Sequence, residues 1–194
     1  TGRMFHQRGW SLGTSSNYSV VLEHEPLKLL VTASGKHKNR LTRNDFVQVG
    51  EEGKPLHENQ PKASAETLLH VAIAQETKAG AILHTHSVWG TVLSGQFFQQ
   101  GAIQISDYEM LKGLDNVKTH QHTEHLAIFD NTQDIAQLAS DLRDRFQQQP
   151  EQLAHGFLIR QHGLYTWGET LADAQRQIEV FEFLLECVGR RSGS

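Results

Sequence analysis

The sequence is poor in cysteine, in long apolar stretches and in excess positive charge. Its single cysteine, Cys187, has no partner for an internal disulfide bond, which is typical of a reducing compartment. No apolar run approaches the roughly 18 residues that cross a membrane, and no charged-then-apolar leader opens the chain. A net charge of −4 lacks the basic footprint of general nucleic-acid binding. We therefore expect a cytoplasmic protein with no nucleic-acid or membrane partner.

What is present indicates a folded protein of one domain. The chain has 194 residues, of which 38% are hydrophobic and 21% charged, a composition too apolar for disorder. This length suits one globular core, so we expect a single domain across residues 1–194. The unusual component is histidine, with 12 residues. Histidine is the commonest metal ligand and the usual proton carrier near neutral pH.

Apolar clusters and helical spacing alternate irregularly along the chain. The clusters predict strands at 20–22, 29–31, 45–49, 81–83, 126–129, 156–160 and 164–168. Helical spacing predicts helices at 66–78, with Ser64 as the N-cap, and at 88–93, 135–146 and 170–188. The hairpin-like strand pairs favour a mixed or antiparallel sheet flanked by helices over a doubly wound fold.

The most distinctive local feature is the pair His84 and His86 at the end of an apolar strand. Residues i and i+2 of a strand point to the same face, so the two imidazoles lie side by side. His162 follows another apolar strand, and Gly163 permits a tight turn there, which makes His162 a candidate third ligand. Three protein ligands leave a zinc ion one open position. Taken alone, a His-x-His pair is more often two unrelated strand-end histidines.

The other histidines form no comparable pattern. His120, His122 and His125 lie in a polar segment without an apolar frame, and we interpret them as solvated loop residues. The remaining six are interpreted as surface or core-edge residues: His6, His24, His37, His57, His70 and His155.

Two glutamates are candidate proton carriers for such a metal site, where a carboxylate often fills this role. Glu109 lies in a mostly apolar stretch, and Glu66 opens the helix before the histidine strand. Each has an ordinary alternative on composition alone. Glu109 is equally explained as a surface acid on a short helix, and Glu66 as a first-turn acid that complements the helix dipole.

Two turns have the composition of anion-binding loops. The segment 13–19 is dense in hydroxyls, and the segment 32–38 follows an apolar strand and adds Lys36 and Lys38. Hydroxyls, backbone N–H groups and a lysine together suit a phosphate. Neither segment matches a Walker or dinucleotide-binding loop, and both are also explained as ordinary turns.

Taken together and in order, these motifs resemble the class II aldolase and adducin-head superfamily. The resemblance covers about residues 9–189, and its motifs are 13–19, 31–38, 64–67, 82–89, 109–113 and 162–169. Each motif alone is unspecific, whereas their joint order and spacing is specific to the superfamily. The stretches around Glu109 and 162–169 are similar to its dehydratase branch.

The resemblance implies a three-layer α/β fold with a central, mostly antiparallel sheet between helices. It also implies a homotetramer with active sites at the subunit interfaces. The final helix carries more apolar surface than one face needs, which we interpret as burial at a subunit contact: Phe181, Phe183, Leu184 and Leu185.

The resemblance further implies one zinc ion per subunit, held by His84, His86 and His162. In the dehydratase branch the acid/base glutamate corresponds to Glu109, whereas the sugar-phosphate aldolases place theirs at Glu66. The aldolases have a glycine where Ser16 stands, which weakens the aldolase interpretation. The positions that correspond to phosphate contacts are Ser16, Asn17, Ser34 and Gly35, with Lys112 as a further candidate.

The implied activity is dehydration of 5-methylthioribulose 1-phosphate to 2,3-diketo-5-methylthiopentyl 1-phosphate, a step of methionine salvage. Glu109 would take the C3 proton and help the C4 hydroxyl leave as water. Zinc would stabilise the negative charge formed when the proton leaves. The alternatives are a sugar-phosphate aldolase or 4-epimerase, for example on fuculose or ribulose phosphate, and a non-catalytic adducin-head-like binding module. The three histidines argue against the last, since a scaffold needs no metal ligands.

Overall fold

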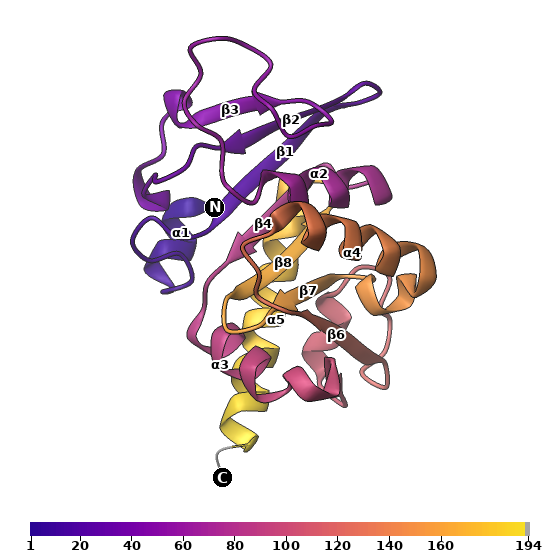
Figure 1. Ribbon diagram of the computed structural model, residues 1–194. Helices are drawn as coiled ribbons and strands as arrows, with labels where there is room; N and C mark the ends of the chain where they lie inside the picture. The colour runs from indigo at the N-terminus through magenta and orange to yellow at the C-terminus, as the bar shows by residue number, and fades with distance from the viewer. Residues whose placement is uncertain (193–194) are drawn as a thin grey trace.

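A computed structural model describes residues 1–192 and contains a mixed β-sheet. Within these residues the sheet has eight strands in the order β3-β2-β1-β4-β8-β7-β6-β5 (Figure 1). All neighbouring strands are antiparallel except β6 and β7, which are parallel. The prediction of a mostly antiparallel sheet is confirmed. The strands are β1 (Asn17–His24), β2 (Leu27–Thr32), β3 (Phe46–Val49), β4 (Ala81–Thr85), β5 (Ala102–Ser106), β6 (Thr123–Phe129), β7 (Gly156–Ile159) and β8 (Gly163–Gly168).

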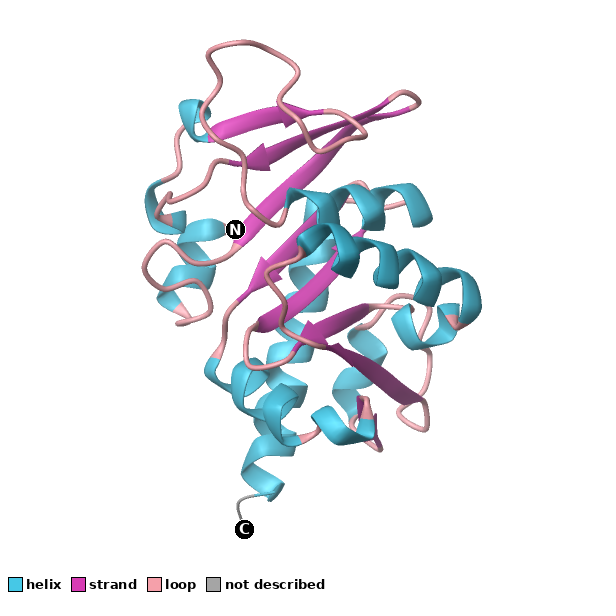
Figure 2. Ribbon diagram, viewed as in Figure 1, coloured by secondary structure: helices cyan, strands magenta, loops and turns pink. Residues whose placement is uncertain are grey.

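Helices cover both faces of the sheet, as the three-layer prediction requires (Figure 2). α2 (Thr67–Glu76) and α4 (Ile135–Gln148) enclose one apolar core. α3 (Val88–Gln96), α5 (Leu171–Ser192) and the short α1 (Gly2–Gln7) enclose the other. None of the described helices combines the length and the apolarity of a membrane span.

β4 lies at the centre of the sheet and is buried along its whole length. Its alternate side chains enter opposite cores, with Ile82 on the side of α2 and Leu83 on the side of α5. A strand buried on both faces has a continuous apolar sequence. In β4 the apolar residues are 81–83, and His84 is the first polar residue after them. The flanking strands pair Asn17 of β1 and Tyr165 of β8 with His84. The sheet therefore gathers polar side chains at this end of β4.

α2 begins one residue later than predicted, and its N-cap residue is Glu66. The prediction of Ser64 as the N-cap is wrong, because the chain makes a turn before the helix. In this turn the Thr67 amide donates to the Ser64 carbonyl at 3.2 Å, and the Glu66 amide donates to the Ser64 hydroxyl at 3.3 Å. The turn places Glu66 at the amino terminus of α2, beside the end of β4.

The apolar cluster of α5 belongs mostly to the core of the same chain. Phe181, Leu184 and Leu185 are fully buried, whereas Phe183 is 47% exposed. The interpretation of all four as surplus surface for a subunit contact is therefore wrong for three of them. α5 lies between the sheet, α3 and the 3-10 helix η4 (Glu109–Gly113), and this environment needs a wide apolar stripe.

Candidate active site

Three histidine rings meet at the carboxyl end of β4. His84 is in β4, His86 follows the strand, and His162 comes from the turn between β7 and β8. The ring centroids are 4.5, 4.6 and 5.0 Å apart. One nitrogen of each ring lies within 4.8 Å of the others, and the Nε2 atoms of His84 and His86 are 2.8 Å apart. The structure thus brings together the three residues that the sequence pattern singled out.

The turn between β7 and β8 has to be narrow for His162 to reach β4. Gln161 takes a left-handed conformation, with φ of 51°, and the His162 amide donates to the carbonyl of Ile159 at 3.1 Å. A Cβ on Gly163 would lie 2.0 Å from the carbonyl oxygen of Thr85. Only glycine therefore allows the start of β8 to approach β4 at this point.

The two more deeply buried histidines of this group are held neutral. Burial lowers the pKa of His84 well below its ordinary value, and the neighbouring His86 and His162 lower it further. Burial, together with His162 and Lys38, lowers the pKa of His86 to about 4. Nδ1 of His84 donates to the carbonyl of Leu164 at 2.9 Å, so the lone pair of His84 is on Nε2, toward the other rings. Neutral imidazoles oriented through their second nitrogen suit a divalent metal ion.

The carboxylate of Glu66 lies against these ring nitrogens. Its Oε1 is 3.1 Å from Nε2 of His162, and its Oε2 is 3.5 Å from Nε2 of His84. Oε2 also accepts hydrogen bonds from the amide of Asn17 at 2.6 Å and the hydroxyl of Tyr165 at 2.8 Å. Burial and the charge of Glu66 raise the pKa of Tyr165 well above its ordinary value, so Tyr165 remains a donor. These two bonds direct the carboxylate of Glu66 toward the histidines.

A buried histidine on α2, His70, holds the side chain of Asn17 by a hydrogen bond. Nε2 of His70 bonds to Oδ1 of Asn17, and Nδ1 of His70 bonds to the hydroxyl of Ser19 at 2.8 Å. Burial lowers the pKa of His70 to about 3, which keeps the ring neutral. The interpretation of His70 as a surface or core-edge residue is wrong, because seven of the ten residues of α2 are buried and His70 is one of them. A chain of hydrogen bonds thus runs from Ser19 in the core through Asn17 to Glu66.

A cavity of about 180 Å³ opens beside the histidines and is bounded by both predicted anion-binding loops. Lys38 is 2% exposed, and its ammonium donates to the carbonyls of Lys36 at 2.7 Å and Thr14 at 3.3 Å. Burial lowers the pKa of Lys38 to about 8, so its charge is retained near pH 7. The cavity is lined by Thr14, Ser16, Asn17, Ala33, Ser34, Gly35, Lys38, Ser64, Ala65, Glu66, His86 and His162.

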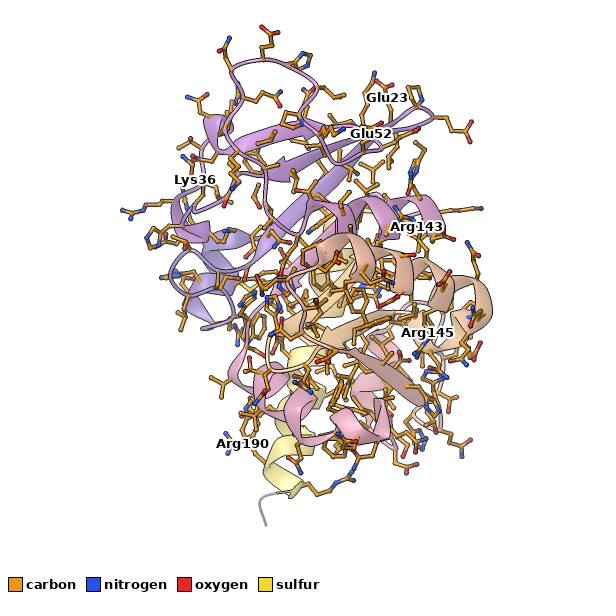
Figure 3. The ribbon with its side chains drawn as sticks, in the orientation of Figure 1. Glu23, Lys36, Glu52, Arg143, Arg145 and Arg190 are labelled. Carbon is orange, nitrogen blue, oxygen red and sulfur yellow. The ribbon has the colours of Figure 1, made fainter. Side chains whose placement is uncertain are left out.

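The sequence pattern could not separate the two lysines of the second loop. Lys36, labelled in Figure 3, forms an ion pair with Asp45 at 2.8 Å and is not part of the cavity wall. Lys38 turns inward from the short 3-10 helix η1 (Lys38–Arg40). Among the residues that line this cavity, Lys38 is therefore the cation available to an anionic ligand, and the sequence pattern alone does not distinguish it from Lys36.

Two predicted site residues lie outside this cavity within the chain. The side chain of Glu109, on η4, is 70% exposed and forms an ion pair with Lys112. Oε2 of Glu109 is 3.7 Å from Nδ1 of His120. Neither Glu109 nor Lys112 lines the cavity. Of the two predicted proton carriers, a single chain therefore places only Glu66 beside the histidines.

One of the three histidines interpreted as solvated loop residues is part of β6. His125 lies within β6, and His122 directly precedes the strand. Nε2 of His122 is 2.8 Å from the buried carboxylate of Glu124. The interpretation as a loop residue is therefore wrong for His125, because β6 begins three residues before its apolar stretch, whereas His122 does lie in the loop that precedes the strand.

The sequence matches one family model along nearly its whole length. The model of the class II aldolase and adducin N-terminal domain covers residues 1–188. The chain belongs to this family. Within the class II aldolase family, a methylthioribulose-1-phosphate dehydratase from Marinobacter nauticus is 46% identical over 96% of this chain and 88% of its own length. The protein of the same name from Pseudomonas fluorescens is 47% identical over 96% of this chain and 87% of its own length.

Solved structures of the class II aldolase family share the fold. The L-fuculose-1-phosphate aldolase from Thermus thermophilus superposes with a TM-score of 0.73 at 22% identity, over 98% of this chain and 91% of its own. The resemblance inferred from the motifs, including the resemblance to the dehydratase branch, is confirmed by the curated relatives.

Proposed function

We propose that this chain is a dehydratase that converts 5-methylthioribulose 1-phosphate to 2,3-diketo-5-methylthiopentyl 1-phosphate and water, in methionine salvage. The observation that carries the proposal is the convergence of three histidines and Glu66 beside one cavity, which is lined by His86, His162, Glu66 and a buried lysine. Relatives of this name at 46% and 47% identity support the choice of substrate. The lone Cys187 agrees with a cytoplasmic location.

The donor set at the end of β4 fits a divalent metal ion, and we propose zinc. His84, His86 and His162 would hold it through ring nitrogens that already lie within 4.8 Å of one another. When bound, such an ion supplies Lewis-acid stabilisation of charge on the substrate oxygens. Two of the three rings are neutral before any ion binds, since burial lowers the pKa of both His84 and His86.

The two loops would hold the substrate phosphate. Ser16, Ser34 and Gly35 line the cavity with hydroxyl and backbone groups, and Lys38 supplies a charge. A hydrogen bond between charged groups is stronger than a neutral one, so Lys38 would contribute more than any single hydroxyl. Asn17 lies on the same wall, but its side-chain amide is held between Glu66 and His70. We assign Asn17 the role of orienting Glu66.

Glu109 remains our proposal for the proton carrier, and it requires a second copy of the chain. Glu109 would take the proton from C3 and deliver it to the C4 hydroxyl, which leaves as water, and the enol that remains would ketonise, with the proton of the C3 hydroxyl lost and C4 protonated, to give the diketone. Its carboxylate is exposed and outside the cavity of its own chain. In a homotetramer with sites at the interfaces, Glu109 and Lys112 of one copy would complete the site of the next.

A direct assay tests the proposed function. The purified protein is given 5-methylthioribulose 1-phosphate before and after chelation, and the diketone product is measured. We expect turnover that chelation abolishes and zinc restores. Glu109→Gln should lower kcat by at least about 100-fold, the usual contribution of a positioned proton carrier. If Glu66→Gln abolished turnover and Glu109→Gln left it intact, the dehydratase mechanism would be wrong.

Co-expression of two inactive variants tests whether Glu109 acts across the interface. In mixed oligomers, some sites combine the intact His84 of a Glu109→Gln copy with the intact Glu109 of a His84→Ala copy. Random pairing should restore activity at about a quarter of the sites. If both residues act within one copy, the mixture stays inactive.

One specific observation favours a second candidate, an aldolase or 4-epimerase. Glu66 lies within 3.1 Å of a histidine nitrogen, at the position that the resemblance assigns to the aldolase glutamate. Cleavage of fuculose 1-phosphate by the zinc-loaded protein, without dehydration of the pentulose, would establish this alternative. A purified chain that retains no stoichiometric metal would instead support a binding module.

A further inference from the structure

A second group of potential metal ligands lies at the opposite end of β7 from the three active-site histidines. His155 directly precedes β7, whereas His162 follows it. The strand has four residues and spans roughly 13 Å, so the two groups are separate. β6 runs parallel to β7, and the start of β6 therefore brings His122 and Glu124 next to His155.

Both histidine rings of this group point at one carboxylate oxygen. Nε2 of His122 and Nδ1 of His155 lie 2.8 and 2.9 Å from Oε2 of Glu124, and the three ligand atoms lie within 4.8 Å of one another. The second nitrogen of His155, Nε2, donates to the carbonyl of Asp115 at 2.8 Å. Metal-binding histidines are oriented by a bond of this kind, and Nδ1 of His84 makes one in the active site.

The group is closed on two sides and open on the third. The side chains of Glu124 and His155 are 3% and 9% exposed, whereas that of His122 is 33% exposed. Few water molecules therefore compete with an ion for the two buried ligands. The exposed edge of His122 gives an ion a route in and leaves room for water as a further ligand, as in zinc sites with three protein ligands.

We propose that His122, Glu124 and His155 form a second divalent-metal site, independent of the active site. Two imidazoles and one carboxylate are a ligand set that zinc accepts. The ion joins the start of β6 to the start of β7. Asp115, which holds His155, also accepts from Arg176 of α5 at 2.6 Å. The site therefore ties α5 to this end of the sheet, and its role is structural.

Metal analysis of the full chain, dialysed against buffered Zn²⁺, tests the proposal. We expect two ions per chain in the unmodified protein and one in His122→Gln, whose amide can still donate to Glu124 but offers no imidazole ligand. His86→Ala should keep the ion of the second site, and the double variant should keep none. His125→Gln is the matched control, because it removes a histidine of β6 outside the group and should leave two ions.

A spectroscopic and a thermal measurement identify the site that is filled. Co²⁺ added to His86→Ala should produce visible absorption of a bound ion and raise the Tm, because an ion that binds the folded state stabilises it. Both effects should be absent in the double variant. If His122→Gln retains as many ions as the unmodified chain, the second site does not exist and the group is an ion pair only. That comparison does not depend on how His86→Ala folds.

Discussion

A buried carboxyl group behind the histidine strand makes stability depend on pH. Glu182 of α5 is 3% exposed, and its Oε1 accepts from the hydroxyl of Thr85 at 3.0 Å. Its Oε2 has no hydrogen-bond partner among the described residues. Burial raises the pKa of Glu182 from 4.5 to about 7, although the side chains of Ser87 and Thr85 oppose this rise. The folded state therefore binds the Glu182 proton more tightly than the unfolded state does.

The sign and size of the effect follow from this difference. Below pH 4.5 the carboxyl is protonated in both states and contributes nothing. As the pH rises from 4.5 to about 7, the unfolded chain ionises freely while the folded chain holds the proton, so the free energy of unfolding falls. Since a tenfold change in proton affinity corresponds to about 1.4 kcal/mol, the loss above pH 7 approaches 3 kcal/mol.

Urea unfolding of Glu182→Gln at pH 5 and pH 8 measures this loss. At pH 8 the variant should be more stable than the unmodified chain by up to about 3 kcal/mol, and at pH 5 the difference should shrink below about 1 kcal/mol. Glu179→Gln, at an exposed position of the same helix, is the matched control and should show no such pH dependence. An equal difference at the two pH values would refute the assignment of a raised pKa to Glu182.

Three further predictions concern the site itself. His84→Ala should remove both the tightly bound metal and the activity, and an active, metal-loaded variant would contradict the ligand assignment. Gly163→Ala should cost about 1–3 kcal/mol in urea unfolding, as overpacking does, because its Cβ meets the carbonyl of Thr85; it should also weaken metal retention by displacing His162. Lys38→Met should raise KM for the sugar phosphate about 10–100-fold, the equivalent of one charged hydrogen bond, with kcat little changed; an unchanged KM would exclude Lys38 from the phosphate site.

The parts of the site that the sequence predicted depend on short-range geometry. His84 and His86 share one face because a strand repeats every two residues, and the apolar run before them identified the strand. His162 was recognisable because a glycine follows it just beyond another apolar strand. The strand repeat and the glycine signal both act within a few residues. The three histidines could therefore be proposed as ligands without knowledge of the strand order.

The parts that were missed depend on contacts between distant segments. The hydrogen bonds of Glu66 come from Asn17 and Tyr165, which are 49 and 99 residues away. The burial of His70 could not be recognised because most of α2 is buried, so the helix has no continuous polar face to compare with an apolar one. The location of Glu109 outside the cavity could not be predicted either, since the path between β5 and β6 follows no simple periodicity.

The two histidine groups are built alike, but only the active-site group could be recognised from the sequence. The reason is again the distance along the chain between the residues that form each group. Each has a buried histidine fixed by a backbone carbonyl, His84 by Leu164 and His155 by Asp115, and each has a carboxylate within 3.1 Å of a ring nitrogen. The ends of β7 are where the chain leaves the apolar core, so polar side chains can gather there at little cost. At the active-site end, His84 and His86 are two residues apart and follow an apolar run, so the sequence predicts a site there. At the other end His122 and Glu124 are also two residues apart, but no apolar run precedes them, and the parallel pairing of β6 with β7 that brings in His155 is a property of the folded sheet alone.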